Sequence, residues 1–205
     1  MSETGYVKYR CEHRVLPPAD FAGFEELNRV RGRLHQLGFI GRYPNGIGFG
    51  NISIRAAAAN HFYISGTMTG GLPELTPAHY TKVVAWDFPR NWLQCEGPVQ
   101  ASSESMTHAA IYEQDATVRA VLHVHDMELW KRLLDRVPTT RKHVEYGTPE
   151  MAAEVGRLFR ESDVRDRRIL AMAGHEEGIF AFGPTPEEAF GILQAARNYF
   201  LGNAS

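Results

Sequence analysis

The chain has 205 residues, 43% of them hydrophobic and 22% charged, and a formal net charge of −2. This composition is that of a globular protein large enough to bury a core without disulfides, and it argues against intrinsic disorder. The near-zero charge gives no positive field to attract nucleic acid or an anionic membrane, and the apolar runs are too short to cross a bilayer. With no leader-type apolar N-terminus and only two cysteines, a cytoplasmic protein is expected.

The first half of the chain predicts one helix and three strands. Apolar residues recur at three- and four-residue spacing over 18–37, which predicts an amphipathic helix that Gly38 ends. A glycine-rich loop over 41–50 and a turn over 66–71 are expected to connect short strands. The predicted strands are 51–55, 61–65 and 83–86.

Helices and strands alternate in the second half of the chain, which predicts a layered α/β fold. Ser102 or Ser103 is expected to cap the first helix of this half, and Thr148 and Thr185 to cap two later ones. No linker is visible, so one domain is expected over 1–205, in which roughly the first 15 residues could be an extension. The predicted helices are 102–114, 128–134, 148–160 and 185–201, and the predicted strands are 118–125, 168–173 and 179–182.

Histidine is the one residue type in excess, with nine copies, about twice the usual proportion. His123 and His125 lie two residues apart on a predicted strand, so both imidazoles would leave the same face and could chelate one metal ion. Two strand histidines with ordinary partners are the alternative. His175 follows another predicted strand, and three histidines with one open position are typical of a catalytic metal site. Such a site suits Zn²⁺, with Mn²⁺, Co²⁺, Ni²⁺ or Fe²⁺ as alternatives.

Glu104 stands at the predicted start of a helix, where free backbone N–H groups and the helix dipole favour an anion. It could be an ordinary acidic residue of a first turn, or the same helix start could hold a phosphate or carboxylate of a substrate. The small-residue turns at 48–51 and 65–67 could also aim N–H groups at an anion, or be plain turns.

Six stretches, taken together and in order, resemble the class II aldolase/adducin family. They are GNISIR (50–55), ISGT (64–67), ASSESMTHAAIY (101–112), AVLHVH (120–125), EYGTPEMA (145–152) and AGHEEGIFAFG (173–183). The resemblance implies a single three-layer α/β domain with a central mixed or antiparallel sheet flanked by helices. It also implies a homotetramer with active sites at the subunit boundaries.

The resemblance implies a role for each matching residue. His123, His125 and His175 would be the metal ligands. Glu104 would be the catalytic acid/base that can also ligate the metal, and Tyr146 would lie near the active site. The residues implied to bind the phosphate or other anion are Asn51, Ser65, Gly66, Ser102 and Ser103. His108, one helical turn after Glu104, is expected to be structural.

Acidic residues mark two departures from the family pattern. Glu176 and Glu177 stand between His175 and Gly178, where the family usually has glycine directly after the histidine. Asp126 follows the histidine pair, where a small or neutral residue is common. These acids could orient imidazoles or could be solvated surface charges. They would also make the pocket less favourable for a dianionic phosphate.

The activity that the resemblance implies is that of a metal-dependent lyase of carbohydrate metabolism. It would cleave or form a C–C bond in a small hydroxy-carbonyl or sugar-phosphate substrate through a metal-stabilised enediolate, with Glu104 as acid/base. A sugar-phosphate dehydratase and a pentulose-phosphate 4-epimerase are alternatives on the same site. An adducin-like binding scaffold is the alternative that is not an enzyme.

Overall fold

Eight strands form one large sheet in the computed structural model, which describes residues 7–57 and 60–202. Residues 1–6 of the predicted extension lie outside these ranges. The sheet is antiparallel except for its first pair, β1 and β7, which run parallel. In spatial order the strands are β1 (Arg10–Val15), β7 (Trp92–Gly97), β6 (Tyr80–Asp87), β5 (Phe62–Ser65), β4 (Asn51–Arg55), β8 (Ala120–His125), β10 (Gly178–Gly183) and β9 (Ile169–Ala171).

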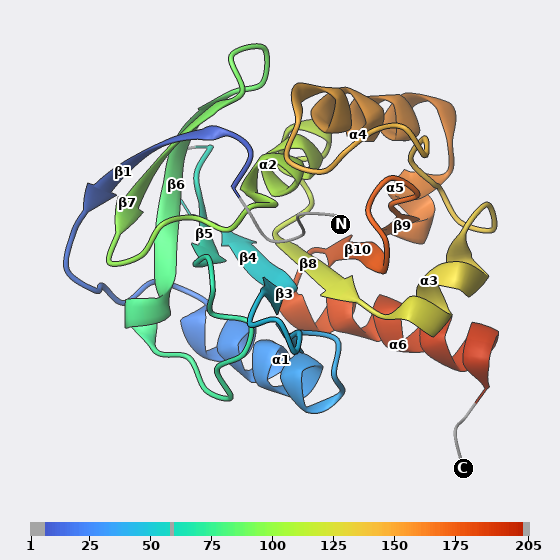
Figure 1. Ribbon diagram of the computed structural model, residues 1–205, viewed down its shortest axis with the longest axis horizontal. Helices are drawn as coiled ribbons and strands as arrows, with labels where there is room; N and C mark the ends of the chain where they lie inside the picture. The colour runs from blue at the N-terminus through green and yellow to red at the C-terminus, as the bar shows by residue number, and fades with distance from the viewer. Residues whose placement is uncertain (1–6, 58–59, 203–205) are drawn as a thin grey trace.

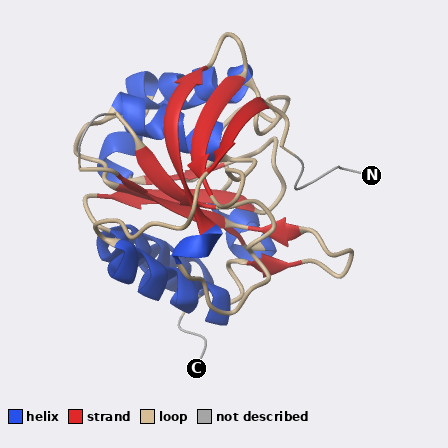
Figure 2. Ribbon diagram, turned by 90° about the vertical axis from the view of Figure 1, so that its left-hand side faces the viewer, coloured by secondary structure: helices blue, strands red, loops and turns tan. Residues whose placement is uncertain are grey.

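Helices cover both faces of this sheet and complete three layers (Figures 1 and 2). On one face lie α1 (Phe24–Gln36), α3 (Met127–Leu133) and α6 (Pro186–Leu201), whose apolar residues share one core with the sheet. On the other face lie α2 (Ser105–Gln114), α4 (Pro149–Glu161) and α5 (Val164–Arg167), around a second core. The predicted layered α/β fold with a mixed sheet is therefore confirmed.

Strand β8 lies in the interior of the sheet, between β4 and β10. Every residue of β8 is buried, because β4 and β10 flank it and helices cover both of its faces. Beside its end, β2 (Gly41–Arg42) and β3 (Gly48–Phe49) form a separate two-stranded hairpin. A short 3₁₀ helix, η1 (Pro77–His79), precedes β6. None of the helices in the described ranges has the length and apolar character to cross a membrane.

Two predictions about the elements are corrected, and two strands were missed. The helix predicted over 18–37 begins only at Phe24, after Gly23 in a left-handed conformation, because Phe21 stacks on Tyr63 at 4.1 Å between ring centroids instead of continuing the helix. The N-cap of α2 is Glu104 and has no side-chain cap bond, since the predicted capping serines lie in the turn before it. The edge strand β1 and its neighbour β7 were not predicted at all. The predicted caps Thr148 and Thr185 are confirmed, because each side chain accepts a backbone N–H.

Candidate metal centre

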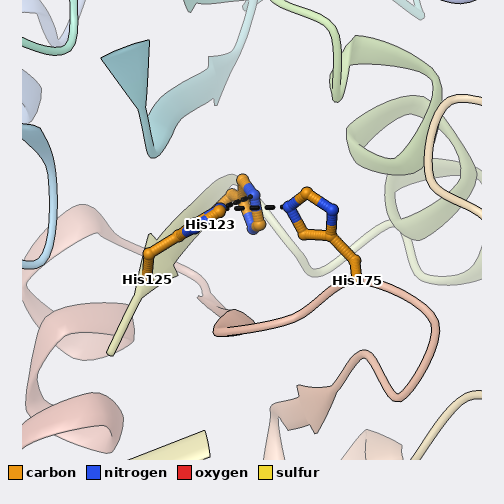
Figure 3. A group of neighbouring side chains, drawn as sticks. All are labelled: His123, His125 and His175. Carbon is orange, nitrogen blue, oxygen red and sulfur yellow. Dashed lines mark hydrogen bonds between the residues drawn. The ribbon is translucent and has the colours of Figure 1, made fainter. Parts of the chain in front are cut away.

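Three imidazoles meet at the end of β8. His123 and His125 lie two residues apart on this strand, so their side chains leave the same face. Nε2 of His125 is 3.1 Å from Nε2 of His123 and 3.1 Å from Nε2 of His175 (Figure 3). The three donor atoms lie within 4.8 Å of one another, which allows a single divalent cation to contact all of them.

The lowered pKa values of these imidazoles favour the neutral form, which can bind a metal ion. Burial lowers the pKa of His123, and the neighbouring His125 and His175 lower it further. Burial also lowers the pKa of His125 and of His175. Neutral imidazole is the form that ligates a metal, and a set of three suits Zn²⁺ and other divalent transition metals. Nδ1 of His123 faces the carbonyl oxygen of Ile179 at 3.3 Å, a partner that leaves Nε2 available.

A buried carboxyl group points at the same place. The hydroxyl of Thr107 donates to Oε2 of Glu104 at 2.6 Å. Oε1 of Glu104 has no hydrogen-bond partner among the described residues and lies 3.9 Å from Nε2 of His175. Burial raises the pKa of Glu104 to about 7, although the Thr107 hydrogen bond and the charge of Lys8 oppose the shift. A carboxyl group of this pKa can take up and release a proton near neutral pH.

Two glycines shape the loop that brings His175 to the pair on β8. A Cβ on Gly174 would lie 1.9 Å from the carbonyl oxygen of Val144, and a Cβ on Gly178 would lie 2.4 Å from Cδ2 of His175. The loop closes through a hydrogen bond from Gly178 N–H to the carbonyl of His175 at 3.0 Å. Only a chain without side chains at these two positions can turn this tightly, so the glycines fix where the third imidazole lies.

The predicted anion-binding residues lie beside the histidines, with one exception. Asn51 is directly opposite His123 in the pairing of β4 with β8, and its buried Oδ1 has no partner among the described residues. Ser65 is not among the described residues that line the pocket, because its hydroxyl accepts a hydrogen bond from Ile52 N–H at 3.1 Å. The predicted residues that do line the pocket are Asn51, Gly66, Ser102 and Ser103.

Loops supply the rest of the pocket, which is partly open to solvent. Tyr43 and Met68 line it and were not predicted, because nothing in their local sequence marks them. Met68 takes a left-handed conformation with φ 63°, which is unusual for a residue with a side chain. The described lining residues include no lysine or arginine. An anion would therefore be held by N–H, hydroxyl and amide groups.

The sequence profile of the class II aldolase and adducin N-terminal domain matches residues 45–200, which contain all the predicted site residues. The chain belongs to the class II aldolase and adducin family. Class II aldolases depend on a metal ion, and the three-histidine group stands where this chain could hold one. No curated protein is significantly similar to the chain in sequence.

Several solved structures share this fold. L-fuculose-1-phosphate aldolase from Thermus thermophilus is 22% identical, with a TM-score of 0.61 over 85% of this chain and 89% of that one. A sugar-phosphate aldolase from Thermotoga maritima is 15% identical, with a TM-score of 0.59 over 89% and 97% of the two chains. YgbL from Klebsiella pneumoniae, for which aldolase, epimerase or decarboxylase activity is suggested, is 19% identical, with a TM-score of 0.62 over 89% and 91%. Identities this low show the fold alone.

The acidic departures from the class II aldolase pattern have three different environments. Asp126 is the N-cap of α3, where Oδ1 accepts the N–H of Leu129 at 2.8 Å. Glu176 is exposed. Glu177 is half-buried and accepts a short hydrogen bond from the hydroxyl of Tyr43, which in turn lies 2.9 Å from Nδ1 of His125. One of the three acids therefore lies next to the histidines.

Tyr146, the tyrosine expected near the active site of a class II aldolase, is buried and packs against one of the histidines. Its ring meets the imidazole of His175 edge-on, with 4.4 Å between the centroids. Nζ of Lys8 lies 4.1 Å above the Tyr146 ring and 2.9 Å from a carboxylate oxygen of Glu145. Tyr146 is not among the described residues that line the pocket, and its catalytic role stays a prediction.

His108 was expected to be structural, and its contacts are those of a core residue. It is fully buried on α2, its Nδ1 lies 2.7 Å from the hydroxyl of Ser53, and its ring meets Phe180 edge-on. It is not one of the three histidines that converge. His108 therefore supports the core of the sheet beside the site.

Proposed function

We propose that this protein is a metal-dependent lyase of the aldolase type, acting on a small hydroxy-carbonyl or sugar-phosphate compound. The observation that carries the proposal is the buried Oε1 of Glu104, which has no hydrogen-bond partner in the described part of the chain and lies beside three converging imidazole nitrogens. A buried carboxyl oxygen without a hydrogen-bond partner costs free energy. Its place next to three imidazole nitrogens therefore indicates a functional role.

His123, His125 and His175 would hold the cation, with Glu104 as a further ligand when no substrate is bound. A divalent cation there would act as a Lewis acid toward a substrate oxygen. Oε1 of Glu104 would take a proton from the carbon next to the substrate carbonyl, and return a proton to that carbon in the opposite direction.

The substrate's anionic group would sit in the same pocket, beside the histidines. Asn51, Gly66, Ser102 and Ser103 line that part of the pocket, and neutral donors of this kind bind phosphate or carboxylate without a cation. Burial of this group would orient the carbonyl end of the substrate toward Glu104. A homotetramer, as the family resemblance implies, is part of this proposal.

The test combines a substrate screen with two variants. Chelator-treated protein reloaded with Zn²⁺ or Mn²⁺ is expected to cleave at least one member of a panel of phosphorylated and plain ketoses, releasing an aldehyde. Glu104→Gln is expected to lose about 10²–10⁴-fold in kcat, the range for a missing general acid or base. His123→Ala is expected to lose the metal, as measured by elemental analysis.

The matched control is Glu113→Gln, an exposed carboxylate on the same helix as Glu104, which should leave the rate unchanged. An unaffected rate in Glu104→Gln would remove its assigned role, and full metal occupancy in His123→Ala would refute the ligand set. Loss of water, or inversion at carbon without cleavage, would replace the aldolase with a dehydratase or an epimerase.

A further inference from the structure

A tyrosine from the small hairpin reaches the histidine pair. Tyr43 directly follows β2, and two backbone hydrogen bonds hold the turn, from Tyr43 N–H to Ile47 O at 2.8 Å and from Gly46 N–H to Tyr43 O at 2.9 Å. Its ring packs on Phe49 of β3, with 4.5 Å between centroids, and Phe49 in turn packs on the ring of His125 at 5.5 Å. The hairpin therefore fixes the Tyr43 hydroxyl beside His125.

This hydroxyl connects an imidazole to a carboxylate. Nδ1 of His125 lies 2.9 Å from Oη of Tyr43, and Oη donates to Oε2 of Glu177. The direct distance from Nδ1 of His125 to Oε2 of Glu177 is longer, 3.6 Å. The three groups form a chain in which the tyrosine oxygen stands between the other two.

The direction of these hydrogen bonds fixes the tautomer of His125. An ionised carboxylate can only accept, so the single Tyr43 proton goes to Glu177. The lone pair of the Tyr43 oxygen must then accept from Nδ1–H of His125. With its proton on Nδ1, His125 presents an unprotonated Nε2, and this is the atom that lies 3.1 Å from Nε2 of both His123 and His175.

The backbone conformation of Glu177 indicates a functional role for its side chain. Its φ is 67°, a left-handed conformation that glycine or asparagine adopts at lower cost. Its carbonyl oxygen also accepts the N–H of Asp126 at 3.2 Å, which ties this strained residue to the end of β8. A glutamate kept in a conformation that favours glycine is typical of functional sites, where a side-chain contact offsets the strain.

We propose that Tyr43 and Glu177 are positioning residues that fix the ring orientation and tautomer of His125, so that its Nε2 is ready to bind a metal ion. The inference rests on the proposed function, because it assumes that His125 is a ligand. His123 uses a backbone acceptor, Ile179 O, for the same purpose. The inserted acid and the hairpin tyrosine thus give this chain a tyrosine-bridged carboxylate–histidine pair, a type of outer contact that raises metal affinity.

The experiment measures Zn²⁺ affinity by competition with a chromophoric chelator for wild type, Tyr43→Phe and Glu177→Gln. Tyr43→Phe keeps the ring against Phe49 and removes only the bridging hydroxyl. Each variant is expected to bind Zn²⁺ about 10–100-fold more weakly. The visible absorption bands of the Co²⁺-loaded protein should also shift in both variants, because the orientation of one ligand changes.

Glu176→Gln is the matched control. Glu176 is the residue next to Glu177, its side chain is exposed, and the substitution removes the same charge. The inference would be overturned if Tyr43→Phe and Glu177→Gln bound Zn²⁺ with an affinity within twofold of that of Glu176→Gln and their Co²⁺ bands were unchanged. If instead wild type binds no Zn²⁺, or His123→Ala binds it as well as wild type does, the metal site itself is refuted. The two failures are therefore distinguishable.

Discussion

The hydroxyl of Tyr9 donates a hydrogen bond to the carbonyl oxygen of Ser102 at 2.7 Å, which joins the start of the chain to the loop before α2. Tyr9 is buried, and its hydroxyl also lies 3.3 Å from the carbonyl oxygen of Ala101. Tyr9, which is far away in the sequence, therefore stabilises the loop at Ser102 that would bind an anion.

Replacing Tyr9 by Phe should lower the free energy of unfolding by about 1 kcal/mol, the value of one buried hydrogen bond. Urea unfolding measures the change. Tyr199→Phe is the matched control, because Tyr199 is 82% exposed, and its free energy of unfolding should equal that of wild type. A Tyr9→Phe variant as stable as the control would show that the hydrogen bond to the loop carries no net stability.

The buried guanidinium of Arg31 supports a neighbouring part of the pocket. It is 1% exposed, and within residues 7–57 and 60–202 its hydrogen bonds all go to backbone carbonyls. The acceptors are Leu72 and Pro73 for Nη1 and Thr69 and Gly70 for Nη2. Lysine cannot reach four acceptors in two directions, so Arg31→Lys should cost about 3 kcal/mol of unfolding free energy in urea.

Arg29→Lys is the control on the same helix. Arg29 is largely exposed and pairs with Glu187, so the change should cost less than about 0.5 kcal/mol. Equal losses in the two variants would mean that the carbonyl cluster around Arg31 contributes nothing beyond an ordinary surface arginine.

The buried His108 predicts a pH dependence of stability. Burial lowers the pKa of His108 to about 3, from an ordinary value of 6.5. Between these values the unfolded chain binds a proton that the folded chain does not, so stability falls as the pH falls. From about pH 7 to about pH 5 this group alone should remove about 2 kcal/mol.

The measurement compares metal-free wild type with His108→Gln by urea unfolding at both pH values. Wild type should lose about 2 kcal/mol more than the variant between them, whatever the variant's own stability at neutral pH. The other buried histidines are present in both proteins and cancel in the difference. Identical losses would show that His108 is protonated in the folded state.

The two cysteines of the chain lie close together in the fold. Sγ of Cys11 on β1 is 3.6 Å from Sγ of Cys95 on the neighbouring β7, and both thiols are free. Oxidised glutathione is expected to convert the two thiols to a disulfide and to be reduced to two glutathione molecules. Closing so long a loop should stabilise the protein by up to about 4 kcal/mol.

Non-reducing peptide mapping should find the cross-linked pair, and unfolding in urea should measure the gain. Cys11→Ser, which cannot form the bond, should show no gain under the same oxidant. A stable glutathione adduct on Cys11, without the internal disulfide, would mean that the strands do not allow the thiols to approach bonding distance.

The parts of the site that the sequence predicted are those that depend on local spacing. The two-residue spacing of His123 and His125 needs only a strand to place both imidazoles on one face, and the caps Thr148 and Thr185 act within one turn. The convergence of His175 on that pair was inferred from its place at the end of a predicted strand and from the family resemblance.

What the sequence did not predict depends on contacts between distant segments. Tyr43 acquires its partners only because a hairpin brings residue 43 beside residues 125 and 177. The strand β1 reads RCEHRV, which lacks an alternating apolar pattern, and its extended structure follows from pairing with β7. The exact start of α1 depended on the stacking of Phe21 against Tyr63, which no local signal marks.

The position of β1 limits how the protein can be shortened. The family match begins at residue 45, whereas β1, α1 and Tyr9 all precede it. A fragment trimmed to the match would leave the backbone N–H and C=O groups of β7 open along one side, a surface on which strands of other molecules can add and aggregate. Proteolytic or engineered removal of the first fifteen residues should therefore be detected as loss of solubility.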